Sequence, residues 1–133
     1  MELLVPISPG ELLDKLTILE IKAARITDAE KLAHVKHELD ILNKLWVEAE
    51  LDSPTVCRLK AALKEVNESL WAIEDDIRSL ESQGDFGDGF IALARSVYFT
   101  NDQRATIKRE INQALGSDLV EEKSYADYRQ ENS

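Results

Sequence analysis

Apolar residues recur at every third or fourth position along most of this chain, a spacing that places them on one face of an α-helix. The longest row consists of Val56, Leu59, Leu63, Val66, Leu70, Ile73, Ile77 and Leu80. A shorter row precedes it and consists of Leu32, Val35, Leu39, Leu42, Trp46 and Ala49. Only a few residues around 52–54 join the two rows, so the pattern predicts a long antiparallel helical hairpin over about residues 28–82.

Helix-start signals stand before three of the expected helices. Residues 8–11 read Ser-Pro-Gly-Glu, which offers an N-cap serine, a proline at the first helical position and an early glutamate. Residues 27–30 and 53–54 carry similar signals. The first helix is expected to run to about Ile26, and it should be the most buried.

Two further helices are expected after the glycine-rich residues 84–89. Residues 90–98 are apolar almost all round, and the cap-like residues 100–103 precede a fifth helix that ends before Gly116. The fold class predicted is therefore all-α, an up-and-down bundle of four to five helices. Residues 1–133 form one domain, in which the acidic tail 117–133 is either a short helix or an extended arm.

Composition excludes several classes of function. The 26 acidic residues outnumber the 16 Lys and Arg, and a net charge of −10 repels the phosphate backbone of nucleic acids. Charges interrupt every apolar stretch well before the roughly 18 residues that a membrane span needs, so no membrane insertion is expected. The single cysteine, Cys57, and the lack of a secretion-signal pattern favour a cytoplasmic location.

Several charged residues interrupt the apolar helix faces. On a helical wheel Glu20 projects into the apolar arc of the first helix, whereas the opposite face carries Glu11, Asp14, Lys15, Lys22 and Arg25. Arg104 and Lys108 fall within the apolar stripe of the fifth helix, and Arg95 lies on the nearly all-apolar fourth helix. Buried cations need partners, so Arg95, Arg104 and Lys108 are expected to converge with Glu20.

Two interpretations of this cluster stay open. The charges either form a closed structural network or surround a cavity for a phosphate or carboxylate, with Tyr98 and Asn101 as neutral hydrogen-bond partners. No metal site is predicted, because His34 and His37 lack the spacing of known zinc or di-iron motifs. No cofactor is predicted either, since the glycine-rich residues 84–89 follow no strand and lack the Lys-Ser/Thr of a phosphate-binding loop.

A third feature points to an interaction face. Trp71, Asp75 and Arg78 share the side of the long helix that faces away from its apolar row. Apolar residues also lie outside the expected core faces, namely Ile18, Ile21 and Ile41. Such surplus apolar surface is typical of a protein that binds another subunit, so a homo-oligomer is expected.

Three stretches resemble a family of small bacterial proteins classed as a domain of unknown function. They are residues 5–22 with the phrase ELLDKLTILEIK, residues 71–78 with WAIEDDIR, and residues 90–112 with VYFTNDQRATIKREIN; residues 121–125, EEKSY, extend the likeness. The resemblance implies a bacterial origin and an intact domain.

Two functions are compatible with these observations. The first is a helical interaction and oligomerisation module. The second is an all-α enzyme or sensor that binds a small anionic metabolite through buried Arg and Lys, and the sequence leaves open whether the protein is an enzyme.

Overall fold

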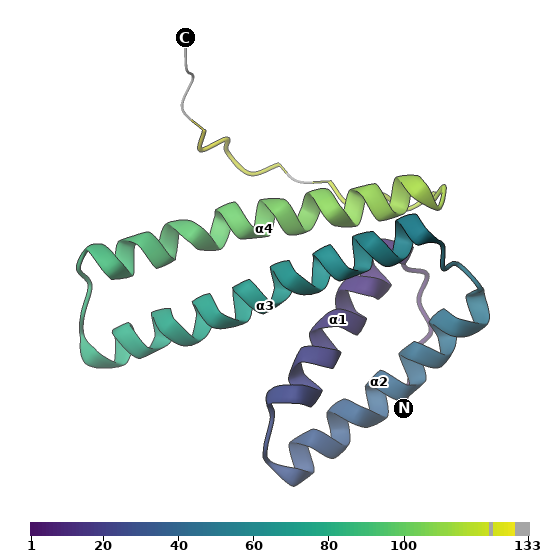
Figure 1. Cartoon of the computed structure of the whole chain (residues 1–133), viewed down its shortest axis with the longest axis horizontal. Helices are drawn as coiled ribbons and strands as arrows, with labels where there is room; N and C mark the ends of the chain where they lie inside the picture. Colours follow the sequence, from purple (N-terminus) through teal and green to yellow (C-terminus); the bar gives the residue numbers. More distant parts are fainter. Residues whose placement is uncertain (123, 130–133) are drawn as a thin grey trace.

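A computed structural model describes residues 1–122 and 124–129. Lys123 and residues 130–133 of the predicted tail lie outside the described residues. The described part of the chain forms four α-helices and no strand: α1 (Pro9–Arg25), α2 (Ala29–Ala49), α3 (Pro54–Gln83) and α4 (Asp88–Ala114) (Figure 1). The all-α prediction is confirmed. None of these helices combines the length and the hydropathy needed to cross a lipid bilayer.

Short polar side chains cap three of the helices at the positions that the sequence predicts. Ser8, Asp28 and Ser53 each accept a hydrogen bond from the backbone N–H three residues further on, at 2.9–3.1 Å. Pro9 and Pro54 occupy the first helical position after two of these caps, where no backbone donor is required. The starts of α1, α2 and α3 are therefore set locally.

The predicted division of residues 90–115 into two helices is wrong, because α4 is continuous from Asp88 to Ala114. Residues 100–103 resemble a cap, but no glycine or proline interrupts the helix there. Their side chains also find partners that do not require the helix to end: Asn101 accepts a weak hydrogen bond from Arg104, at 3.4 Å. The packing of α4 against α3 and α1 thus overrides the local capping preference.

The predicted pairing over residues 28–82 is also wrong, because α2 packs only against α1. Figure 1 shows α2 and α3 diverging from the short connection between them, while α3 and α4 lie side by side and run in opposite directions. α1 packs against all three other helices. The sequence predicts that the apolar rows of α2 and α3 pack against each other. In the structure both rows pack against the apolar residues of α1 instead.

The core gathers around α1, which is the most buried helix, as predicted. Leu13 and Leu16 of α1 are fully buried against Trp46 of α2, Leu63 of α3 and Ile111 of α4. This core occupies one end of the α3–α4 pair. Residues 68–100, here called the distal hairpin, extend beyond it, and none of them is buried.

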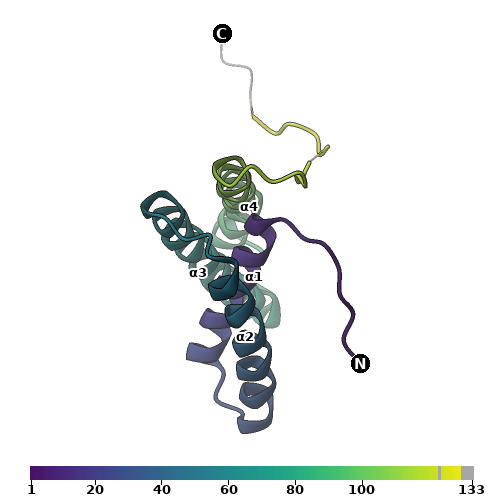
Figure 2. The same cartoon turned by 90° about the vertical axis from the view of Figure 1, so that its right-hand side faces the viewer.

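The described residues before α1 and after α4 lie outside the helices. Residues 1–7 are exposed and have no regular structure, and Figure 2 shows them leading away from the bundle. The segment after α4 turns at Gly116, which has a φ of 63°, and returns along the same helix. The rings of Tyr128 and Tyr98 lie 4.9 Å apart between centroids, so the tail contacts α4 about four turns from its end.

Gly10 allows the start of α1 to approach α4 closely. A Cβ atom at this position would lie 2.5 Å from the backbone oxygen of Lys108 and 2.9 Å from Oδ1 of Asn112. The backbone N–H of Gly10 donates to that same Oδ1, at 2.8 Å. The contact therefore needs a residue without a side chain.

We expect Gly10→Ala to lower the free energy of unfolding by about 1–3 kcal/mol, because the added methyl group forces α1 and α4 apart. Chemical denaturation monitored by circular dichroism measures this change. The matched control is Gly89→Ala in the first turn of α4, where an added Cβ has no neighbour within 4 Å. Gly89→Ala should be neutral or stabilising, and equal effects of the two variants would contradict the close approach.

Candidate functional site

A network of charged side chains lies where α1 meets α3 and α4. Its centre is Asp14 of α1, whose carboxylate is almost completely buried. Arg104 of α4 binds both oxygens of this carboxylate, with its Nε 2.8 Å from Oδ1 and its Nη2 in close contact with Oδ2. Such a paired geometry is the strongest form of ion pair in proteins.

Neutral groups satisfy the remaining positions around Asp14. Nδ2 of Asn67, a buried residue of α3, lies 3.0 Å from Oδ1 of Asp14 and 3.0 Å from the hydroxyl of Thr17. The Thr17 hydroxyl in turn donates to the backbone oxygen of Asp14, at 2.8 Å. Three helices therefore contribute to one hydrogen-bonded group.

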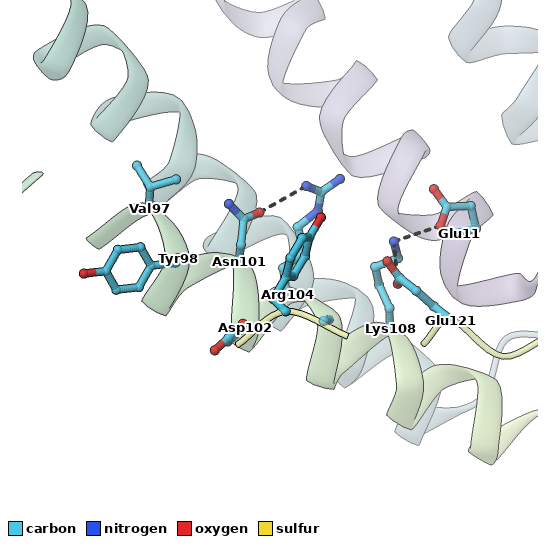
Figure 3. A pocket seen from close by; sticks show the side chains of 10 residues that line it. Glu11, Val97, Tyr98, Asn101, Asp102, Arg104, Lys108 and Glu121 are labelled. Atoms are coloured by element: carbon cyan, nitrogen blue, oxygen red, sulfur yellow. Dashed lines mark hydrogen bonds and ion pairs between the residues drawn. The ribbon is translucent and has the colours of Figure 1, made fainter. Parts of the chain in front are cut away.

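Lys108 forms the second half of the network. Its Nζ, of which little is exposed, lies 2.8 Å from Glu11 of α1, 3.9 Å from Asp14 and 2.9 Å from Glu121 of the segment after α4 (Figure 3). One buried cation thus joins α1, α4 and the tail. The neighbouring Arg109 adds weaker contacts to the tail, including an ion pair with Glu122 at 3.8 Å.

The charges hold each other in their ionised forms. Burial by itself would raise the pKa of Asp14, but the hydrogen bonds from Arg104 and Asn67 and the nearby positive charges outweigh it and lower the pKa. The hydrogen bond with Asp14 raises the pKa of Arg104. Burial would lower the pKa of Lys108, yet the carboxylates of Glu11 and Glu121 outweigh this effect and raise the pKa.

A cavity of about 630 Å³ opens beside Lys108, and it is here called the Lys108 pocket. It has the size of small-molecule sites in proteins. Figure 3 shows side chains of α1, α4 and the tail around it. Its lining residues are Glu11, Val97, Tyr98, Asn101, Asp102, Arg104, Ala105, Lys108, Glu121 and Tyr125.

Four of the six residues predicted for an anion cluster line this pocket together, namely Tyr98, Asn101, Arg104 and Lys108. Glu20 and Arg95 do not join them, so the expected convergence of all the charges is wrong. Glu20 faces α3, where it pairs with Lys60 at 3.2 Å and Lys64 at 3.3 Å.

Arg95 lies in the distal hairpin, and its guanidinium is 5.9 Å from the ring centroid of Phe99. Because α4 is one straight helix, the 13 positions between Arg95 and Lys108 separate them by about 20 Å along its axis. In this part of α4 the neighbouring helix is α3, and it leaves the Arg95 side of α4 uncovered. Arg95 therefore stays exposed.

The helical wheel places Asp14, the central residue of the network, on the polar face of α1. One edge of that face is in fact covered, since Thr17 is fully buried and Ile21 is 3% exposed, whereas Lys15 stays exposed. The signal for this was present in Ile21, which lies beside Asp14 at that edge. An apolar residue at the edge of a polar face indicates that the buried arc of the helix is wider than its main apolar row.

The predicted interaction face lies within the distal hairpin. Trp71 is half-buried, and the guanidinium of Arg25 lies 5.8 Å from its ring centroid. Asp75 and Arg78 are exposed, and Arg78 pairs with Glu74 of the preceding turn at 3.1 Å. The end of α1 thus covers part of the tryptophan, and the rest of this face is open to solvent.

The fold and the network define the class of the protein as a small all-α domain that is organised around a buried ion-pair cluster. The chain belongs to a family of unknown function, DUF6165, whose model matches residues 3–131. No curated protein and no solved structure matches the chain. In the described residues no group of three or more His, Cys, Asp or Glu side chains could hold a metal ion.

We expect Asp14→Ala to lower the free energy of unfolding by about 3–5 kcal/mol, because it leaves the enclosed Arg104 and Lys108 without their shared partner. Glu20→Ala is the matched comparison. Glu20 belongs to a partly solvated pair with two lysines, so its loss should cost at most about 1 kcal/mol. Urea unfolding of the two variants tests this ranking, and a larger cost for Glu20→Ala would contradict it.

The lowered pKa of Asp14 also predicts that the protein loses stability at acid pH. A carboxyl group with a depressed pKa in the folded state stabilises the protein above its unfolded pKa, whose ordinary value is 3.8. This stabilisation should be lost as the pH falls from about 4 through the folded pKa. In thermal melts, Asp14→Asn should reduce the fall in melting temperature at acid pH. Asp40→Asn, a change at an exposed residue, should leave that fall as steep as in the wild type.

Proposed function

We propose that this protein is a homodimerisation module in which the distal hairpins of two copies pack together as a four-helix bundle. The observation that carries the proposal is the absence of any buried residue from 68 to 100. Two packed helices expose the flanks of their shared apolar row, and a stable bundle needs a further layer to cover them.

The apolar content of the distal hairpin supports a partner. Its central row, Leu70, Ile73, Ile77 and Leu80, is only half-buried between α3 and α4. Phe86 and Ile91 at its far end are 55% and 51% exposed. The complete removal of such a side chain from water contributes about 1.5–3 kcal/mol. The monomer does not gain this free energy, and a dimer that buries these side chains would.

The total surface also supports association. The chain exposes 9459 Å², whereas a compact monomer of 15.0 kDa is expected to expose about 7,000 Å². The extended ends of the chain account for part of this excess. The remainder is compatible with the roughly 800 Å² that each partner buries in a stable interface.

Charge complementarity favours a second copy as the partner. In the distal hairpin α4 exposes Ile91 and one cation, Arg95, while α3 exposes three acids, Glu74, Asp75 and Asp76, of which Glu74 pairs with Arg78. A two-fold interface is self-complementary, so each copy can place its Arg95 against acidic residues of the other. The predicted face of Trp71, Asp75 and Arg78 belongs to this surface. The single cysteine, Cys57, fits a cytoplasmic location for the dimer.

We expect the purified protein to have twice the 15.0 kDa mass of one chain, and Ile91→Glu to convert it to the monomer. The added carboxylate would place an unpaired charge among the apolar residues of the interface. Sedimentation equilibrium over a hundredfold range of concentration measures both states. The melting temperature of the wild type should rise with concentration, because association stabilises the folded state.

Val47→Glu serves as the control, because Val47 is an exposed apolar residue of α2 outside the distal hairpin. It should leave the dimer intact. The proposal fails if the wild type is monomeric at the highest concentration, or if Val47→Glu dissociates the dimer as completely as Ile91→Glu does.

A further inference from the structure

The tail carboxylate of Glu121 occupies a position that a ligand could take. Its Oε2 atom lies 2.9 Å from Nζ of Lys108, inside the Lys108 pocket. The other direct partner of this lysine, Glu11, is held by the first turn of α1, where Ser8 caps the helix. Glu121 instead belongs to a segment without helix or strand, so fewer contacts fix it in place.

The pocket has room beyond the Glu121 carboxylate. The volume of about 630 Å³ is free space with the Glu121 side chain in place, and it lies between α4, the start of α1 and the tail. Tyr98, Asn101 and Tyr125 line the remainder and can make polar contacts with a bound molecule. These neutral groups would select among ligands after the charged end has bound.

Electrostatic balance decides which charge the position accepts. Asp14 and Glu11 offset Arg104 and Lys108 in number, and this set of four is held by helices α1 and α4. Asp102 also lines the pocket, but it precedes Lys108 by six positions on α4, about 9 Å along the helix axis. Glu121 is therefore the carboxylate beside Lys108 that a ligand can replace. A ligand carboxylate at the same place would recover the charge-assisted hydrogen bond without moving the lysine.

We propose that the Lys108 pocket binds a small carboxylic acid, and that Glu121 fills the carboxylate position in the free protein. The acid competes with the chain's own side chain for Nζ of Lys108. The tail and the pocket are thus coupled: the ligand displaces the Glu121 carboxylate, and a docked Glu121 weakens the binding of the ligand.

Calorimetric titration of the full chain with succinate at constant ionic strength tests this competition. We expect weak binding by the wild type and at least tenfold tighter binding by Glu121→Ala, because that variant removes both the competitor and its negative charge. Glu122→Ala is the matched control: Glu122 is the next residue, pairs with Arg109 and is mostly exposed. It should bind succinate as the wild type does.

Three results would overturn the proposal. The first is no saturable binding of succinate by Glu121→Ala. The second is equal tightening by Glu121→Ala and Glu122→Ala, which would reveal a general effect of tail charge. The third is binding of inorganic phosphate as tight as that of succinate, since the site would then not select carboxylates.

Two further measurements verify the binding position. In the wild-type protein, succinate should shift the backbone NMR signals of Glu121 and Tyr125 and of the Lys108 turn, while those of the distal hairpin stay in place. Lys108→Arg, which keeps the charge but alters its geometry, should weaken binding by tenfold or more. Shifts confined to other surfaces would assign succinate to a different site and refute the proposal.

Discussion

The contact between Asp14 and Arg104 constrains how α1 lies against α3 and α4. A carboxylate that is removed from water costs several kcal/mol unless its partners are present in the right geometry. Arg104 presents two nitrogens to it, and Asn67 approaches from α3. Because a paired contact of this kind tolerates little sliding or rotation, it fixes the register of α1 against both helices of the α3–α4 pair.

The rest of the junction follows from that register. With α1 in place, Gly10 lies against the backbone of α4, and Glu11 reaches Lys108. Lys108 then remains buried and still charged, so it attracts a further carboxylate from the chain that follows α4. A structural ion pair in one helix thereby creates the surroundings in which a tail residue, and in our proposal a ligand, can bind.

The two ends of the α3–α4 pair differ in how far their apolar residues are buried. At one end α1 supplies a layer of apolar side chains, and the fully buried Leu13, Leu16, Leu63 and Ile111 form a core there. The distal hairpin has no such layer, although its apolar row continues with the same spacing. An amphipathic pattern predicts that one face of a helix is buried, but it does not show whether the same chain or a partner buries it.

Local signals in the sequence determined the helical class, the starts of three helices at Ser8, Asp28 and Ser53, and the presence of cations on the apolar stripe of α4. Each depends on residues that lie within a turn or two of one another. Tertiary structure alone decided that α2 pairs with α1, that α4 continues through Asn101, and that Asp14 lies at the centre of the network. A helical wheel assigns a polar face without knowing how many helices surround it. Here three other helices pack against α1, so one edge of its polar face, which would be solvated in an ordinary surface helix, holds the buried carboxylate.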